Sequence, residues 1–321
     1  MQNADPRGPE DLHRRRIPAR WEVHQPTHSV EEVWAGTEDF RLVPRDYEAL
    51  SALFERNFAT SKQMEMFMSE AYATNRLARL CREGLVARIS VPRMVRGEVN
   101  GRAFAYSLTA FGLECLIAGG HRDAMERQGA WRPPYTTNSN RSNVLHDLAV
   151  GDLSNGIVRY FEGNNISAGW KGARDAVQKA NPMVAGGQTF ILAPDAAVTL
   201  ATADTLLIEY EESLRPDSFG ERLANYQRYF ERRLWESDYL KAPKVLISAS
   251  QTADRQRYWA NPFDEALKMA MAATHLYQHV YLIKEEAWRV GDWTVQPIRP
   301  GEPVVSLKVA ATGEAAPSSS V

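Results

Sequence analysis

Cysteine, long apolar runs and a strong net charge are all scarce or absent in this sequence of 321 residues. Only Cys81 and Cys115 occur, without the paired spacing of a zinc site, which predicts a reducing compartment and two packed thiols. No apolar run reaches the roughly 20 residues that span a bilayer, and residues 1–20 are polar rather than signal-like. Together these absences predict a cytoplasmic protein with no membrane partner. The formal net charge is -2, so any attraction to nucleic acid must be local.

The length and the 44% of hydrophobic residues fit two domains of ordinary size. Stretches without a sustained helical or strand period, or rich in Pro, Ser and Asn, mark the boundaries. We predict a flexible arm at 1–40, with Trp21 and Trp34 as docking points, a first domain at 41–128, a linker at 129–140, a second domain at 141–309 and a disordered tail at 310–321.

The first domain has the pattern of a three-helix unit followed by a hairpin. Apolar residues at spacings of three and four predict helices at 45–54, 62–68 and 70–83, and Gly84 is well placed to end the third. Strand-like segments follow at 85–91 and 103–108, joined by the charged, Gly-containing loop RMVRGEVNGR. A basic hairpin after three helices predicts a winged helix-turn-helix domain that binds double-stranded DNA.

The outer face of the third helix and the hairpin supply the residues for DNA contact. Between 71 and 110 the chain carries seven arginines and two glutamates, a local formal charge of +5. Arginine suits this role because its planar fork pairs with phosphate oxygens or with a guanine edge. A solvated or protein-docking face is the alternative. The predicted DNA-binding residues are Tyr72, Asn75, Arg76, Arg79 and Arg82 on the helix, and Arg93, Arg96 and Arg102 on the wing.

Two short segments of this domain resemble a known sequence pattern. The segments LCREGLV at 80–86 and YSLTAFGL at 106–113 resemble the winged-helix pattern of MarR-type and related DNA-binding domains. In that pattern the recognition helix ends at the glycine, and the second wing strand runs into Leu-Thr before a last helix. The resemblance covers about a quarter of the chain.

The second domain has the element order of a restriction-endonuclease-like fold. We predict a helix at 141–161, strands at 166–170, 189–200 and 205–210, a helix at 219–234, a strand at 244–250, a helix at 263–279 and a strand at 280–283. Alternating strands and helices indicate a mixed sheet flanked by helices. The whole chain is therefore predicted to be α/β, or α+β when both domains are counted.

Two strand acids are the candidate catalytic residues and metal ligands of this domain. Asp195 and Glu209 fit positions that could hold a magnesium or manganese ion against a phosphate. The lysine expected two positions beyond the second acid is Glu211, which either adds a ligand or marks a lost activity. Arg222 or Lys171 could aim a cation into the site, but arginine is a poor general base. His146 is a further candidate, as a proton shuttle or phosphate donor.

Four segments resemble the replication-relaxation proteins of plasmids and other mobile elements. They are VLHDLAV at 144–150, PDAAV at 194–198, LIEYE at 207–211 and ERLANY at 221–226, behind the winged helix. The resemblance implies a role in plasmid replication or mobilisation. The chain departs from the family pattern at two places, since no acid closely follows Trp170 and Arg222 stands where the pattern has lysine.

Three hypotheses follow. The first is a DNA-binding protein of a mobile element or the host chromosome, whose degenerate nuclease-like domain acts as a binding or assembly platform. Replication or mobilisation proteins are the expected partners. The second is a nuclease or nickase that uses magnesium or manganese at Asp195 and Glu209. The third is a transcription regulator, expected to act as a homodimer, whose second domain senses a ligand or dimerises.

Overall fold

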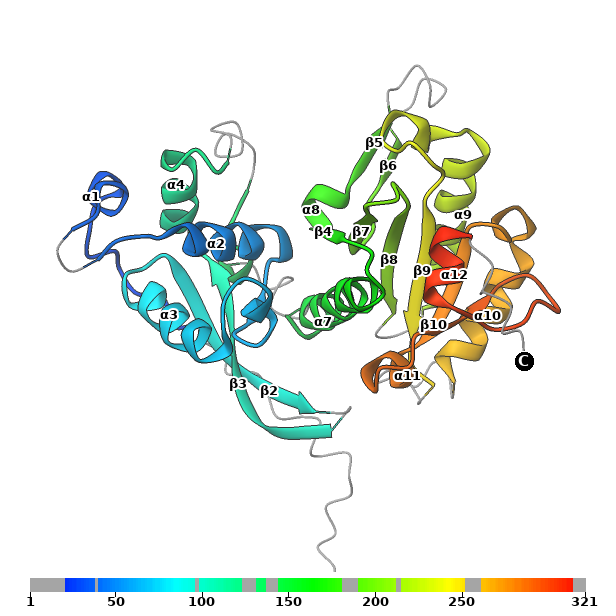
Figure 1. Ribbon diagram of the computed structural model, residues 1–321, viewed down its shortest axis with the longest axis horizontal. Helices are drawn as coiled ribbons and strands as arrows, with labels where there is room; N and C mark the ends of the chain where they lie inside the picture. Colours follow the sequence, from blue (N-terminus) through cyan, green and yellow to red (C-terminus); the bar gives the residue numbers. More distant parts are fainter. Residues whose placement is uncertain are drawn as a thin grey trace, which may run out of the picture. The chain divides into compact units, whose positions relative to one another are not determined.

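The computed structural model describes residues 21–37, 40–95, 98–122, 131–136, 144–180, 190–211, 215–251 and 261–313, without the side chains of 70, 92–101, 179 and 180. The chain divides into two compact units, Met1–Val144 and Leu145–Val321 (Figure 1). Within the described ranges, no helix has both the length and the apolarity to cross a membrane.

The N-terminal unit combines helices with a three-stranded antiparallel sheet in the order β1-β3-β2. This arrangement, with the short strand β1 before η2 and the long β2-β3 hairpin after α3, fits a winged helix. The elements are α1 (Val30–Ala35), α2 (Pro44–Arg56), β1 (Ala59–Thr60), η2 (Gln63–Met66), α3 (Glu70–Arg82), β2 (Val86–Val95), β3 (Glu98–Leu108), α4 (Ala110–Ala118) and η3 (Pro134–Thr136). The helix predicted at 62–68 is only the 3-10 turn η2.

The end of α3 is fixed by Gly84, as the sequence predicts. Gly84 has a φ of 78°, a conformation that glycine adopts without a Cβ penalty. The amides of Gly84 and Leu85 donate to the carbonyls of Cys81 and Leu80, which closes the last turn. Both cysteines of this unit, Cys81 and Cys115, are buried free thiols.

The first forty residues are not a structureless arm throughout. Residues 1–20 lie outside the described ranges. Trp21 is buried and stacks on Phe58, with the ring centroids 5.4 Å apart. Ser29 and Glu32 form a capping box that begins α1, and this local signal explains a helix where we predicted none. Trp34, our second docking point, is 62% exposed instead.

Part of the predicted linker packs onto the N-terminal unit. The ring of Trp131 lies 5.8 Å from that of Phe54, and the ring of Tyr135 lies 5.7 Å from that of Trp21. These aromatic side chains bury apolar area, which outweighs the turn-forming Pro and Thr residues around them. The rest of the segment, 129–130 and 137–140, lies outside the described residues.

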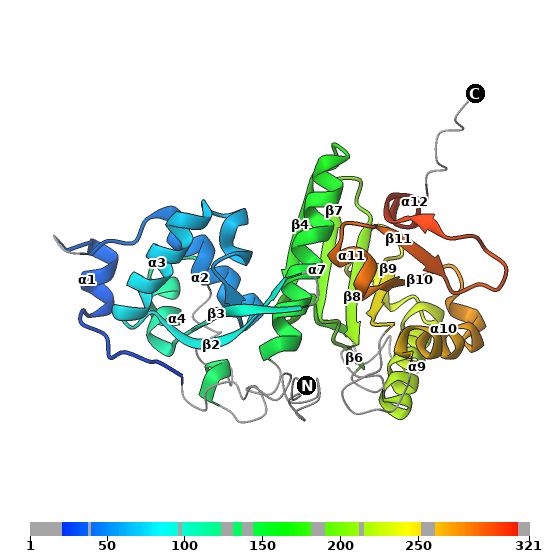
Figure 2. The same ribbon diagram turned by 90° about the horizontal axis from the view of Figure 1, so that it is seen from below.

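The second unit is built on a seven-stranded mixed sheet in the order β12-β11-β10-β9-β8-β7-β4, beside the two-stranded sheet β5-β6 (Figures 1 and 2). Its strands are β4 (Ala168–Gly172), β5 (Gln178–Ala180), β6 (Phe190–Leu192), β7 (Ala196–Leu200), β8 (Thr205–Glu211), β9 (Lys244–Ala249), β10 (Val280–Lys284), β11 (Thr294–Pro297) and β12 (Val305–Ser306). Its helical segments are α7 (Val144–Gly163), α8 (Ala173–Ala176), α9 (Pro216–Glu231), η4 (Leu234–Ser237), α10 (Pro262–Ala272), η5 (Thr274–Leu276), α11 (Glu285–Arg289) and α12 (Leu307–Thr312).

The strand pairing reproduces the element order that we predicted. Strands β4, β7 and β8 form an antiparallel meander after α7, and α9 then crosses over to β9, which runs parallel to β8. The single strand predicted at 189–200 is wrong, because the chain leaves the extended ladder at 193–195. As a result β6 pairs with β5, while β7 joins the main sheet.

Two layers of helices bury the main sheet. A cluster of buried residues joins α9 and α10 to one face, through side chains such as Phe219, Tyr226 and Phe263 (Figure 2). Helix α7 lies on the other side, where Leu153, Ile157 and Phe161 are buried. A Cβ on Gly156 of α7 would lie 2.7 Å from the Trp293 ring, so glycine permits this close packing.

Part of the segment predicted as a disordered tail is helical. Ala310 and Ala311 are buried in α12, whose Ser306 cap accepts a hydrogen bond from the Val309 amide. Small residues gave no signal of a helix here, because alanine contributes little to an apolar stripe. Residues 314–321 lie outside the described ranges.

Candidate functional site

An acid cluster forms where β7 begins and β8 ends. Ala196 of β7 is paired with Ile208 of β8, and the Asp195 amide donates to the Ile208 carbonyl at 3.0 Å. The Asp195 carboxylate then accepts the Tyr210 amide through Oδ2 at 2.8 Å. Asp195 and Glu209, predicted from separate segments, therefore lie at the same end of neighbouring strands.

Arg222 of α9 lies against both glutamates of β8. Because side chains alternate along a strand, Glu209 and Glu211 share the face that α9 covers. The Arg222 Nη1 donates to Glu209 Oε2 at 3.0 Å and also to Glu211 Oε1. One helical turn later, the Tyr226 hydroxyl donates to Glu209 Oε1 at 2.6 Å.

Burial raises the pKa of both glutamates in this cluster. Glu209 and Glu211 are only 2% and 6% exposed. Desolvation, with the charge of Asp195 added, raises the pKa of Glu209 to about 8, against the lowering effect of Arg222. Desolvation likewise raises the pKa of Glu211. Burial therefore opposes ionisation of both glutamates, and Arg222 favours it.

His146 of α7 lies on the other side of Asp195. Its Nε2 is 3.4 Å from Asp195 Oδ2 and 3.1 Å from the Tyr210 carbonyl, and its Nδ1 is 3.3 Å from Asp147 Oδ1. Burial lowers the pKa of His146, but hydrogen bonds to Asp147 and Asp195 and their charges raise it further, to about 11. At neutral pH it is an imidazolium that donates hydrogen bonds, which is a poor state for a proton shuttle.

In this arrangement the donor set does not fit a magnesium or manganese ion. Arg222 and Tyr226 engage the two oxygens of Glu209, and Arg222 also holds Glu211. Within the described residues, the one group of three ligand atoms within 4.8 Å of one another lies elsewhere, in the N-terminal unit. Of the two cations considered for this site, Arg222 fills the position and Lys171 is exposed on β4.

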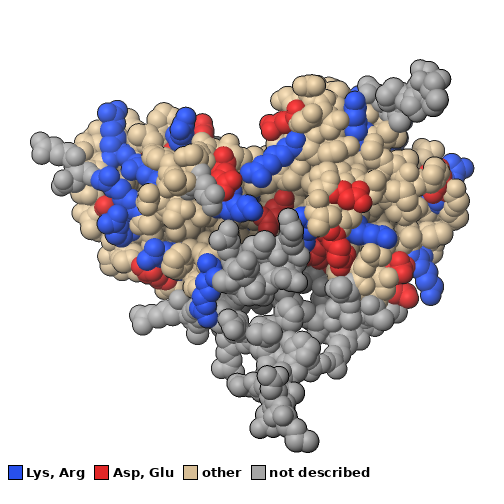
Figure 3. Space-filling view, turned by 60° about the horizontal axis from the view of Figure 1, so that its bottom comes forward, with Lys and Arg blue, Asp and Glu red and all other residues tan. Residues whose placement is uncertain are grey.

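The second candidate surface is the outer face of α3. Tyr72, Asn75 and Arg82 are exposed, at spacings that place them with Arg79 along one side of the helix. Arg79 is half-buried, and its guanidinium lies 5.4 Å from the centre of the Phe40 ring. Figure 3 shows Lys and Arg side chains gathered on the visible face of the N-terminal unit.

Arg76 was predicted to face DNA, and its geometry contradicts this. Its Nε donates to Asp46 Oδ1 at 2.8 Å, and one terminal nitrogen donates to Asp46 Oδ2 and to the Arg41 carbonyl. Asp46 is fully buried, so it holds the guanidinium inside the unit rather than on its surface. Arg76 and Asp46 therefore form an ion pair within the unit.

Only part of the predicted wing can be placed. Arg102 is exposed on β3, with one terminal nitrogen 3.4 Å from the Ser90 hydroxyl. The side chain of Arg93 and the whole of Arg96 lie outside the described residues, so their roles stay predictions.

A family model described as replication-relaxation matches residues 50–245, which include α3, β7, β8 and α9. The chain belongs to the replication-relaxation family. No curated protein and no solved structure matches it. The family match thus spans the acid cluster and most of the winged-helix unit of this replication-relaxation protein.

Sequence reasoning missed two members of the acid cluster. Tyr226 was not among the predicted site residues, although it lies four residues after Arg222 and so on the same helical face. Asp147 was not among them either. The spacing from Arg222 could have identified Tyr226, whereas the contact of Asp147 depends on a rotamer that no sequence pattern encodes.

Proposed function

We propose that this replication-relaxation protein binds duplex DNA through its N-terminal unit. Its second unit then serves as a non-cleaving platform in the replication or mobilisation of a plasmid or other mobile element. The observation that supports this most strongly is the exposed row on α3, formed by Tyr72, Asn75 and Arg82 beside the half-buried Arg79. A helix of this kind, followed by a basic hairpin, matches the docking geometry of DNA-reading winged helices.

The α3 row and the hairpin would make different kinds of contact with DNA. The α3 row would enter the major groove, where Asn75 and Arg79 can read base edges. Arg102 of the hairpin would contact phosphate, which positions the protein without reading sequence. Arg76 takes no part, because Asp46 holds it.

Salt dependence tests the DNA-binding proposal. A labelled duplex is titrated with the full-length protein at a series of salt concentrations. The logarithm of the affinity should fall linearly with the logarithm of the salt concentration, with a slope of about -0.9 for each phosphate contact. Absence of binding at low salt, or an affinity indifferent to salt, would remove the proposal.

The geometry of the acid cluster favours a platform over a nuclease. Arg222 already pairs with the two glutamates that a metal would need, and arginine does not serve as a general base near neutral pH. His146 is held as a cation between Asp147 and Asp195. The cluster can therefore hold α7, β8 and α9 together without supplying a base or a metal-bound water.

A plasmid-nicking assay tests this choice. Supercoiled plasmid is incubated with purified protein and magnesium or manganese, beside an Asp195→Ala variant. We expect both proteins to leave the plasmid supercoiled. Nicking by the wild type that the Asp195→Ala variant lacks would establish the nuclease instead.

We make a separate proposal about the oligomeric state. Winged helices often bind two-fold sites as dimers, so we propose a homodimer on DNA, with replication or mobilisation proteins as partners of the second unit. Light scattering with and without duplex DNA measures this. A strict one-to-one complex with DNA would exclude the dimer.

A further inference from the structure

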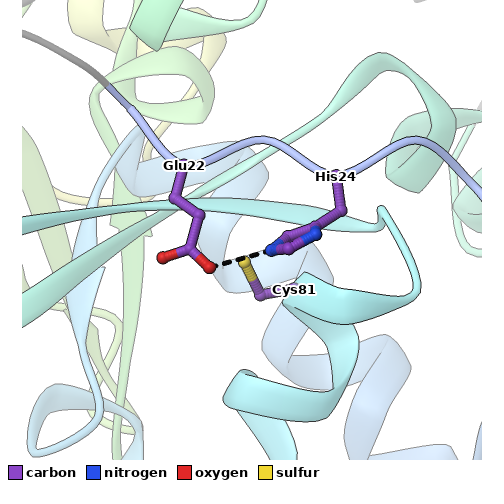
Figure 4. Close-up of side chains that lie close together, drawn as sticks. All are labelled: Glu22, His24 and Cys81. Carbon is purple, nitrogen blue, oxygen red and sulfur yellow. Dashed lines mark hydrogen bonds and ion pairs between the residues drawn. The ribbon is translucent and has the colours of Figure 1, made fainter.

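Three metal-binding side chains from distant parts of the sequence meet in the N-terminal unit. They are Glu22, His24 and Cys81, and their ligand atoms all lie within 4.8 Å of one another (Figure 4). Glu22 and His24 come from the segment before α1, whereas Cys81 lies in the last turn of α3. In Figure 4 the three side chains point toward one another, with the Cys81 sulfur beneath the Glu22 and His24 pair.

The segment that carries Glu22 and His24 is held in place independently of any ion. The backbone groups of Glu22 and Arg88 exchange two hydrogen bonds, of 2.8 and 3.0 Å. Farther along the segment, the Thr27 hydroxyl donates to Glu83 Oε2 at 2.6 Å. Trp21 is buried at its start. A preordered cluster binds a metal more tightly than a flexible one, because the ordering entropy is already lost on folding.

The three side chains form a chemically coherent set. A thiolate, an imidazole nitrogen and a carboxylate oxygen are the ligands that zinc takes in proteins, and three of them leave a fourth position for water. We infer that Glu22, His24 and Cys81 form a binding site for zinc or a similarly thiophilic divalent cation. The half-exposed Glu22 and His24 leave one side of the site open to solvent, while Cys81 is buried.

Arg88 fits the role of an outer partner of this site. Its Nε donates to Glu22 Oε2 at 2.6 Å, and a terminal nitrogen lies 2.9 Å from Oε1. Oε1 is also the oxygen within 2.8 Å of His24 Nε2. Metal binding would replace the His24 contact and the weaker Arg88 contact on Oε1, and leave Arg88 on Oε2 to orient the carboxylate.

Binding requires the Cys81 thiol to lose its proton. The thiol proton passes to solvent as the metal–sulfur bond forms, so one proton is released and no oxidant is needed. The bound ion, one thiolate and one carboxylate then sum to no net charge, which suits a partly buried site next to Arg88. The ion would fasten the N-terminal segment to the end of the helix proposed to enter DNA.

The test uses the full-length protein freed of metal with a chelator and then supplied with zinc alone. We expect one equivalent to bind and to raise the melting temperature. With cobalt in place of zinc, the absorption spectrum should contain a thiolate-to-cobalt charge-transfer band. Cys81→Ser and His24→Ala should each weaken zinc binding by about tenfold or more, since even the loss of an outer partner of a metal site typically costs that much.

Cys115→Ser is the matched control, since Cys115 is also a buried free thiol but lies outside the cluster. This variant should bind zinc as the wild type does and keep the cobalt band. Absence of zinc binding in the wild type would overturn the inference. So would equal binding by wild type, Cys81→Ser and His24→Ala, because the ion would then sit elsewhere.

Discussion

Arg76 and Arg222 both direct their guanidinium groups at buried carboxylates. Arg76 meets Asp46, which is fully buried, and Arg222 meets Glu209 and Glu211. In each case the acid cannot reach water, so its charge needs an internal partner. This need decides the orientation of both arginines more strongly than their position on a helix face. Surface arginines such as Arg82 have no such constraint.

Loss of Arg76 should be costly at the residue scale. Arg76→Ala leaves the buried Asp46 carboxylate unpaired, and breaking a buried pair typically costs about 3–5 kcal/mol. We expect the free energy of unfolding, from urea denaturation, to fall by about that amount. Arg82→Ala, an exposed control on the same helix, should change it by less than about 0.5 kcal/mol. Similar values for both variants would show that the Asp46 pair is not structural.

The glutamate cluster should make stability depend on pH. The pKa of Glu209 is raised to about 8 from 4.5, so the folded state holds a proton that the unfolded state releases. The contribution of Glu209 to the free energy of unfolding is complete below pH 4.5 and declines as the pH rises toward 8. The pKa of His146 is raised from 6.5 to about 11, so its contribution to the free energy of unfolding also declines from pH 6.5 upward.

Unfolding measured between pH 5 and pH 8 tests this linkage. The free energy of unfolding should decrease with rising pH in the wild type and decrease less steeply in Glu209→Gln, which cannot titrate. Glu221→Gln, an exposed glutamate on the neighbouring helix α9, is the control and should retain the wild-type slope. An unchanged slope in Glu209→Gln would mean that Glu209 is ionised throughout.

At the scale of elements, α3 connects the segment before α1, which carries Glu22 and His24, to the β2-β3 hairpin. Its last turn supplies Cys81 and ends at Gly84. A Cβ at Gly84 would lie 2.9 Å from the Pro26 nitrogen, so the segment packs directly on this turn. The position of the segment and the end of the helix therefore depend on the same residue.

Gly84→Ala should disturb both features. The φ of 78° is strained for alanine, by roughly 1 kcal/mol or more, and the contact with Pro26 adds a steric clash. Gly120→Ala is the control, because its φ of 72° is similar but no atom lies within 4 Å of the added Cβ. Gly84→Ala should lower the melting temperature more than Gly120→Ala does. Equal shifts would show that the segment does not pack on Gly84.

Periodicity and turn residues predicted the long elements well. The third helix, its end at Gly84 and the strand that carries Glu209 all follow from local patterns. Asp195 was placed within one long strand, whereas it directly precedes β7. The direction of Arg76 could not be predicted, because its partner Asp46 lies thirty residues earlier in the sequence. The short strands β11 and β12 and the alanine-rich α12 were missed because they contain too few large apolar residues for a period.

At the scale of the whole molecule, the family match covers parts of both units, whereas the proposed activities divide between them. The N-terminal unit carries the exposed row on α3, and the second unit carries an acid cluster paired with Arg222 and His146. This division explains how a chain with a net charge of -2 could bind DNA, since the basic surface is local. DNA binding is the central claim.

The most direct measurement of that claim compares duplex affinity between two variants by fluorescence anisotropy. The first is the double variant Asn75→Ala with Arg82→Ala, which alters only exposed residues of α3. The second is Arg132→Ala, which removes an exposed arginine outside that helix. Our account predicts that the double variant binds about tenfold or more weakly while Arg132→Ala binds as the wild type does. Equal affinity of the double variant, Arg132→Ala and the wild type would contradict it.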